Sequence, residues 1–134
     1  MNEAVTVIPY LCCKNAPAAL DFYTKAFGAT ETLRWPDPTG RISHAEFKIG
    51  DALVMLADEH AEIGVLSPQS IGGTAVFLVL TVPNVDAVYA HAVAAGATVR
   101  RELADQPYGR RSAQLTDPFG HRWDLGSPIE PKNQ

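Results

Sequence analysis

Apolar and polar residues along the first half of the chain follow two different periods. The run 5–13 is apolar and rich in β-branched residues, which is typical of a strand. Apolar residues then recur at helical spacing over 19–27, after Asn15 as an N-cap and before Gly28 as the residue that ends a helix. Three further strands are predicted at 30–35, 41–49 and 52–57, separated by turn-forming residues.

The second half of the chain repeats this order of elements. The pattern predicts a strand at 74–82, a helix capped by Asn84 and ended by Gly96, and strands at 98–103, 111–116 and 122–125. The triplet Gly-Ala-Thr at 28–30 recurs at 96–98, 68 residues later, and Gly50 recurs as Gly120, 70 residues later. Matched landmarks in the same order indicate an internal repeat of a βαβββ module.

The repeat predicts an α+β fold in which two tandem βαβββ modules form a curved mixed sheet with a concave pocket. One helix per module covers only one face of the strands, so the other face stays open. We expect a single domain over 1–134, with module one at about 4–59, a linker at 60–73, module two at 74–127 and a frayed tail at 128–134. Open sheet edges favour completion by a second chain.

Composition narrows the classes of function. The chain has 134 residues, of which 46% are hydrophobic and 19% charged, which suits one globular domain. A net charge of -4 without a basic stripe argues against nucleic-acid binding, and the apolar runs are too short to span a membrane. The N-terminus lacks the features of a signal peptide, so we expect a cytoplasmic protein. Cys12 and Cys13 are neighbours on a strand, so we expect structural thiols and no disulfide between them.

His44 is the first candidate for chemistry. Within the predicted strand 41–49, Ala45 and Phe47 share one face and His44 lies on the other. If the apolar pair faces the helix, His44 points into the concavity, where it could act as an acid or base or orient a polar ligand. The alternative is a histidine of the pocket wall without chemistry.

Asp124, in the last predicted strand, is the second candidate. It could be a lone carboxylate with a raised pKa that acts as a base, or a partly solvated acid paired with Arg122 or Arg111. Arg110 and Arg111 follow a turn and could bind an anionic ligand, although solvated surface charge also explains them. The aromatic residues expected near the groove are Tyr10, Trp35, Phe77, Tyr108 and Trp123.

Two segments carry a family resemblance. Residues 19–29, with Ala-Leu-Asp-Phe-Tyr and Ala-Phe-Gly-Ala, and residues 117–123, Asp-Pro-Phe-Gly-His-Arg-Trp, resemble the vicinal-oxygen-chelate (VOC) superfamily of glyoxalases, bleomycin resistance proteins and dioxygenases. Together with Pro-Tyr-Leu at 9–11, they are similar to its PhnB-like branch. The resemblance spans about 5–127 and implies a homodimer, but the fold hosts isomerases, lyases, dioxygenases and drug-binding proteins.

The resemblance also locates the positions that hold a metal in the family members that use one. In this sequence those positions fall on Ile8, Val54, Phe77 and Asp124, of which only Asp124 could bind an ion. A divalent cation needs three or four ligands, so we expect no metal and no other cofactor, and a ring-cleaving dioxygenase is excluded.

We therefore expect a metal-independent small-molecule-binding protein, similar to the bleomycin-resistance relatives, whose ligand the sequence does not identify. The alternative is a glyoxalase-like lyase or isomerase that uses His44 or Asp124 as its acid or base. The expected ligand-binding residues are Tyr10, Trp35, His44, Phe77, Tyr108, Arg111, Trp123 and Asp124.

Overall fold

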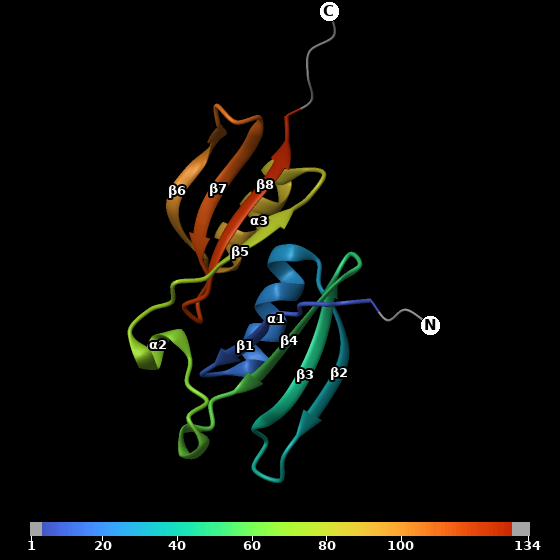
Figure 1. Cartoon of the computed structure of the whole chain (residues 1–134), viewed down its shortest axis with the longest axis vertical. Coiled ribbons are helices and arrows are strands. Elements are labelled where there is room, and N and C mark those ends of the chain that lie inside the picture. The colour runs from blue at the N-terminus through green and yellow to red at the C-terminus, as the bar shows by residue number, and fades with distance from the viewer. Residues whose placement is uncertain (1–3, 130–134) are drawn as a thin grey trace, which may run out of the picture.

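The computed structural model describes residues 4–129 and contains two modules with the same order of elements (Figure 1). Module 1 consists of β1 (Tyr10–Cys13), α1 (Ala16–Phe27), β2 (Thr30–Pro36), β3 (Ile42–Ile49) and β4 (Ala52–Asp58). Module 2 consists of β5 (Phe77–Thr81), α3 (Val85–Ala95), β6 (Thr98–Asp105), β7 (Arg110–Thr116) and β8 (Arg122–Pro128). The prediction of an α+β fold with two tandem βαβββ modules is confirmed.

Each module builds a four-stranded mixed sheet. The strand orders are β1-β4-β3-β2 and β5-β8-β7-β6, with the first pair of each sheet parallel and the others antiparallel. No ladder joins the two sheets within residues 4–129. Their edges are nevertheless neighbours, because Pro9 and Leu11 line one small cavity together with Val76 and Leu78.

The predicted caps of both long helices are present. The side chains of Asn15 and Asn84 accept hydrogen bonds from backbone N–H groups in the first turns of α1 and α3. Gly28 and Gly96 end the helices in the left-handed region, with φ of 69° and 118°. A side chain would be strained at such angles, so glycine allows each helix to stop and the next strand to begin.

The core is continuous between the modules. Helices α1 and α3 contact each other, and Tyr23 of α1 stacks on Phe47 of β3 with ring centroids 5.0 Å apart. On its other side Tyr23 lies 5.6 Å from Trp123 of β8. The Tyr23 hydroxyl donates to Asp117, in the turn between β7 and β8, at 2.6 Å. One buried helix residue therefore ties module 1 to module 2.

Residues alternate between the two faces of each sheet, and α1 and α3 contact only one of them. We call the other face the open face. Buried Ala45, Phe47, Trp123 and Leu125 face the helices, so their strand neighbours His44, Glu46 and Asp124 belong to the open faces. This confirms the expected alternation of residues 44–47.

Several strand ends differ from the sequence-based expectation: β5, for example, begins at Phe77 and not at residue 74. The first strand begins at Tyr10 and not at residue 5, since Pro9 has no N–H to continue the ladder, although its carbonyl accepts from Met55. The last strand extends to Pro128, and Ile129 donates to the carbonyl of Gly109. The remainder of the predicted tail, 130–134, lies outside the described residues.

The predicted linker contains two short helical turns, η1 (Ala61–Ile63) and α2 (Pro68–Ile71). Glu59 anchors this segment: its carboxylate accepts from the backbone N–H and hydroxyl of Ser67 and from the hydroxyl of Ser70. These bonds, that from Ser67 first, lower the pKa of Glu59 to about 2. None of the helices in residues 4–129 combines the length and apolar character that crossing a bilayer requires.

Candidate functional site

The open face of module 1 brings three of the expected ligand-binding residues together. Trp35 of β2 lies opposite His44 of β3, with ring centroids 5.2 Å apart. The hydroxyl of Tyr10 on β1 lies 2.7 Å from His44 Nδ1, and His44 Nε2 lies 2.8 Å from a carboxylate oxygen of Glu46. Tyr10 and Trp35 are 55% and 56% exposed, so they remain available for contact.

The directions of these hydrogen bonds follow from the groups involved. A carboxylate can only accept, so His44 Nε2 donates to Glu46, and in the neutral ring Nδ1 then accepts from the Tyr10 hydroxyl. Burial, and then the negative charge of Glu46, raises the pKa of the Tyr10 phenol, which therefore stays protonated at neutral pH. Both nitrogens of His44 are occupied, so the ring has no free lone pair with which to remove a proton from a substrate.

A second cavity lies where the modules meet, and we call it the junction pocket. It measures about 650 Å³, within the range of small-molecule sites. Ile8, which precedes β1, and Phe77, at the start of β5, both line it, and these are two of the positions at which the resemblance places metal ligands. Its other lining side chains include Val7, Leu53 and Val79, and Thr6 is the one residue of the wall with a hydroxyl group, so the wall is largely apolar.

The open face of module 2 is charged. Asp124 lies 3.5 Å from Arg110 Nε and 3.9 Å from a terminal nitrogen of Arg101, and it accepts a hydrogen bond from Gln114 at 3.3 Å. Arg110 also donates to the Thr81 hydroxyl and to two backbone carbonyls. Asp124 is thus paired with Arg110 and Arg101. The expectation that it pairs with Arg122 or Arg111 is wrong.

This charged cluster is not fully satisfied. The Nε atoms of Arg101 and Arg110 and Oδ1 of Asp124 are buried without a hydrogen-bond partner in the described part of the chain. The 3.5 Å contact between Arg110 and Asp124 is therefore an ion pair without hydrogen-bond geometry. Each such atom costs about 1–3 kcal/mol, so this cluster is destabilising unless it rearranges.

The remaining sequence-predicted residues are divided between the two faces. Phe77 and the exposed Tyr108 lie on the open side, where Arg101 donates to the Tyr108 hydroxyl at 3.3 Å. Hydrogen bonding, from Ser112 first and then Arg101, lowers the pKa of Tyr108. Trp123 is only 3% exposed and lies in the core. It contributes to the wall of the junction pocket but not to an open face.

Arg111 does not lie beside Asp124. It pairs with Asp86 of α3 at 2.9 Å and with Asp105 at 3.1 Å, on the helix side of the sheet. These two carboxylates, Asp86 first, raise the pKa of Arg111. Its guanidinium is therefore already used by the fold, and the arginine of this turn that reaches the open face is Arg110.

The residues present do not fit a metal of the type that the resemblance implies. Val54 faces the core, paired with Phe47, and the open-face residue at that point of β4 is its neighbour Met55. Three of the four positions, Ile8, Met55 and Phe77, are then poor ligands for a hard or borderline cation. The fourth, Asp124, is neutralised by arginine. Within residues 4–129, no three His, Cys, Asp or Glu side chains converge.

Comparisons with known proteins identify the family. An uncharacterized protein of Mycobacterium bovis is 42% identical over 99% of this chain and 90% of its own length. TioX from Micromonospora sp. ML1 superposes with a TM-score of 0.73 at 26% identity, covering 94% of this chain and 100% of TioX. A PhnB protein from Bacillus cereus gives a TM-score of 0.70 at 21% identity, covering 92% and 99%. Residues 4–125 match the family model described as glyoxalase/bleomycin resistance protein/dioxygenase superfamily, and the chain belongs to that superfamily.

Proposed function

We propose that this protein binds an apolar small molecule in the junction pocket without the help of a metal. The observation that carries the proposal is the replacement of ligand positions by apolar side chains: Ile8 and Phe77 line this pocket of about 650 Å³. An apolar ligand gains about 25 cal/mol for each Å² of apolar surface removed from water, whereas these side chains offer nothing to a cation.

The two candidate catalytic residues support binding more than catalysis. His44 uses both ring nitrogens, with Tyr10 and Glu46. Asp124 faces two guanidinium groups, which hold it in place. A general base needs a free lone pair within reach of the substrate proton. Both lone-pair positions of His44 are engaged, and the unpaired Oδ1 of Asp124 is buried, so the glyoxalase-like lyase or isomerase is not favoured.

We further propose that the protein is a homodimer and that it works in the cytoplasm. Val5 and Val7 are 96% and 94% exposed in the single chain, and Val7 also lines the junction pocket. A second copy that covers this segment would bury both valines and complete the pocket. The free thiols of Cys12 and Cys13 are compatible with a reducing compartment.

Binding is tested with a neutral solvatochromic dye, Nile red, as the probe. We expect a blue-shifted, saturable emission that Ile8→Gln weakens about tenfold, because an amide in the pocket wall must be desolvated. Ile71→Gln is the matched control, since Ile71 lies on α2 and is 62% exposed. Equal weakening by both substitutions, or no saturable binding, would refute the proposal.

Metal independence is tested on protein purified without an affinity tag. We expect less than about 0.1 equivalent of any transition metal, since fewer than three ligands converge. Added zinc, nickel, manganese or iron should leave the Tm unchanged. One equivalent of bound metal, or an increase of several degrees with one ion, would overturn this part of the proposal.

The dimer is tested by light scattering after size exclusion. The wild type should elute as a dimer, and the double variant Val5→Lys/Val7→Lys as a monomer, because lysines would have to be desolvated in the interface. Val93→Lys, on the exposed side of α3, is the control and should remain dimeric. A monomeric wild type, or a dimeric double variant, contradicts the assignment.

A further inference from the structure

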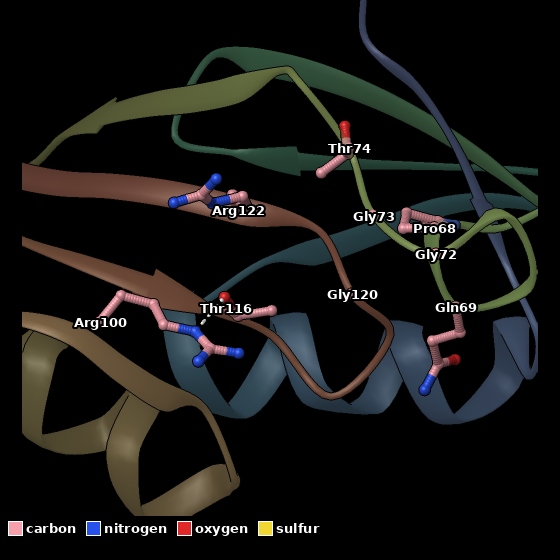
Figure 2. A pocket seen from close by; sticks show the side chains of 9 residues that line it. All are labelled: Pro68, Gln69, Gly72, Gly73, Thr74, Arg100, Thr116, Gly120 and Arg122. Carbon is pink, nitrogen blue, oxygen red and sulfur yellow. Dashed lines mark hydrogen bonds between the residues drawn. The ribbon is translucent and has the colours of Figure 1, made fainter.

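A third cavity lies at the end of module 2, between the linker and the start of β8 (Figure 2). It measures about 600 Å³, and its wall comes from the linker, β6, β7 and β8. The turn before β8 and helix α2 approach closely at Gly120, where an added Cβ would lie 2.9 Å from Pro68. Glycine therefore lets the linker close one side of this cavity, which we call the linker pocket.

Two arginines enter the linker pocket, and no acidic residue lines it. The ion pairs of module 2 within residues 4–129 involve Arg101, Arg110 and Arg111, and none includes Arg100 or Arg122. The charges of Arg100 and Arg122 are thus not compensated by a carboxylate of the described chain. Figure 2 shows Arg122 on the strand that follows Gly120 and Arg100 beside Thr116, to which a dashed line joins it.

Both guanidinium groups are held by contacts that leave donors free. Arg100 Nε donates to the Thr116 hydroxyl at 3.0 Å, and its two terminal nitrogens remain. Arg122 stacks on Phe77, with its guanidinium carbon 4.1 Å from the ring centroid. A stacked guanidinium keeps all its N–H groups at its edge, where an oxyanion can reach them.

The hydroxyl groups of the pocket also act as donors. Thr116 accepts from Arg100, and Thr74 accepts from the N–H of Val76, so each hydroxyl proton is free to point at a ligand. The wall therefore combines two positive charges, two hydroxyl donors and no carboxylate. This is the chemistry that recognises anionic oxygen atoms.

We propose that the linker pocket binds the phosphate or carboxylate group of a small metabolite, with Arg100 and Arg122 as its charge partners. The volume of about 600 Å³ exceeds what an isolated oxyanion needs, so the rest of the molecule has room. Anion binding in the linker pocket depends neither on an apolar ligand nor on metal independence, the two parts of the proposed function. The linker pocket is also a separate cavity from the junction pocket.

The test uses inorganic phosphate and acetate as probes, each titrated into the full-length protein against sodium chloride of equal ionic strength. The readout is the NMR signal of the arginine Nε–H groups. Phosphate should shift the signals of Arg100 and Arg122 saturably, with a Kd on the order of millimolar, as a few charge-assisted hydrogen bonds would give. A response to phosphate alone assigns the pocket to phosphate groups, and a response to both anions assigns it to anionic oxygen in general.

Variants decide whether these two residues are responsible. Arg100→Gln and Arg122→Gln should each raise the Kd for phosphate about tenfold or more. Arg34→Gln is the control, because Arg34 lies on β2 of module 1 and pairs with Glu31. Arg122→Gln also removes the stack on Phe77, whereas the side chain of Arg100 is exposed. Arg100→Gln therefore keeps the fold and tests the site even if Arg122→Gln does not.

Each outcome is decisive. Loss of phosphate binding in the two variants but not in Arg34→Gln supports the proposal. Shifts that grow linearly, shifts equal to those with chloride, or wild-type affinity in Arg100→Gln overturn it. Because Nile red is neutral and Ile8→Gln lies in the other pocket, failure of anion binding leaves the test of the proposed function intact, and the reverse is also true.

Discussion

The substitution Asp117→Ala is expected to remove a large part of the stability of the fold. Asp117 is 4% exposed, and its Oδ2 accepts from the hydroxyl of Tyr23 at 2.6 Å and from the indole of Trp123 at 2.9 Å. Both donors are buried, and alanine would leave them without an acceptor. An unsatisfied buried donor costs about 1–3 kcal/mol, so the pair costs about 2–6 kcal/mol. Relief of the desolvated carboxylate lowers this, and we expect about 3 kcal/mol.

The chain contains its own matched control for this experiment. Asp37 begins another turn with the sequence Asp-Pro-x-Gly, between β2 and β3, and accepts from the N–H groups two and four residues later, as Asp117 does. Asp37 has no buried side-chain donor, so Asp37→Ala should cost about 1 kcal/mol, the value of a turn and a surface ion pair.

Urea unfolding at pH 7, followed by circular dichroism, gives the free energies of unfolding. The difference between the two free energies measures the effect of the buried donors, since both variants remove the same backbone hydrogen bonds of a turn. Tyr23→Phe made in the Asp117→Ala background should then be neutral or stabilising, because it removes one orphaned hydroxyl. A cost of Asp117→Ala within about 0.5 kcal/mol of that of Asp37→Ala would refute the reasoning.

Three further predictions concern single residues. Burial, followed by the charges of Glu59 and Asp58, raises the pKa of Cys12 to about 11, so at pH 8 its alkylation by iodoacetamide should be on the order of 100-fold slower than that of a free thiol. A rate within tenfold of the free thiol, measured by mass spectrometry, contradicts this. Because the folded pKa of Glu59, about 2, lies below its ordinary value, its contribution is present above about pH 4.5 and lost as the pH falls towards 2. Glu59→Gln should therefore lose less of its urea midpoint between pH 6 and pH 3 than the wild type, and an equal loss would exclude the anchoring role. A Cβ at Gly126 would lie 2.6 Å from the Arg110 guanidinium and 2.8 Å from a backbone oxygen, so Gly126→Ala should destabilise by about 1–3 kcal/mol in the same urea assay, and a neutral result would mean that Arg110 moves aside freely.

The fold could be predicted because its signals are local and occur twice. Asn15 and Gly28 bound one helix, Asn84 and Gly96 bound the other, and the structure confirms all four. Such signals act through a few neighbouring residues, and the repeat makes each half a check on the other. The predicted start of the first strand is wrong by five residues, because Pro9 has no N–H with which to continue the ladder.

The site was harder to predict because it depends on which face of a strand each residue occupies. Trp123 and Asp124 are both predicted to bind the ligand, yet adjacent residues on a strand point to opposite faces of the sheet. The same alternation decides which of Arg110 and Arg111 lies on the open face, and here the pattern can be found in the sequence. Arg111 alternates with buried Ala113 and Leu115, which places it on the helix side and Arg110 on the open side.

The sequence does not reveal which side chains pair with one another across the sheet. Arg101 reaches Asp124 because β6 shifts register between Val99 and Arg101, which turns two consecutive arginines towards the open face. Such irregularities have no pattern in hydrophobic periodicity. The contact of His121 with the carbonyl of Cys12, 109 residues away, likewise depends on how the two modules meet.

The repeat explains the fold of this protein but not its function. Asp37, between β2 and β3, and Asp117, between β7 and β8, make the same backbone hydrogen bonds, since both connections use the same type of turn. Only Asp117 also binds two buried side chains. The open faces diverge further, to a tyrosine–histidine–glutamate chain in module 1 and to arginines around one carboxylate in module 2. Residues that shape turns recur because backbone geometry requires them, whereas open-face side chains are free to differ. The function therefore has to be inferred from the side chains of the open faces and of the pockets, such as the apolar wall of the junction pocket and the arginines of the linker pocket.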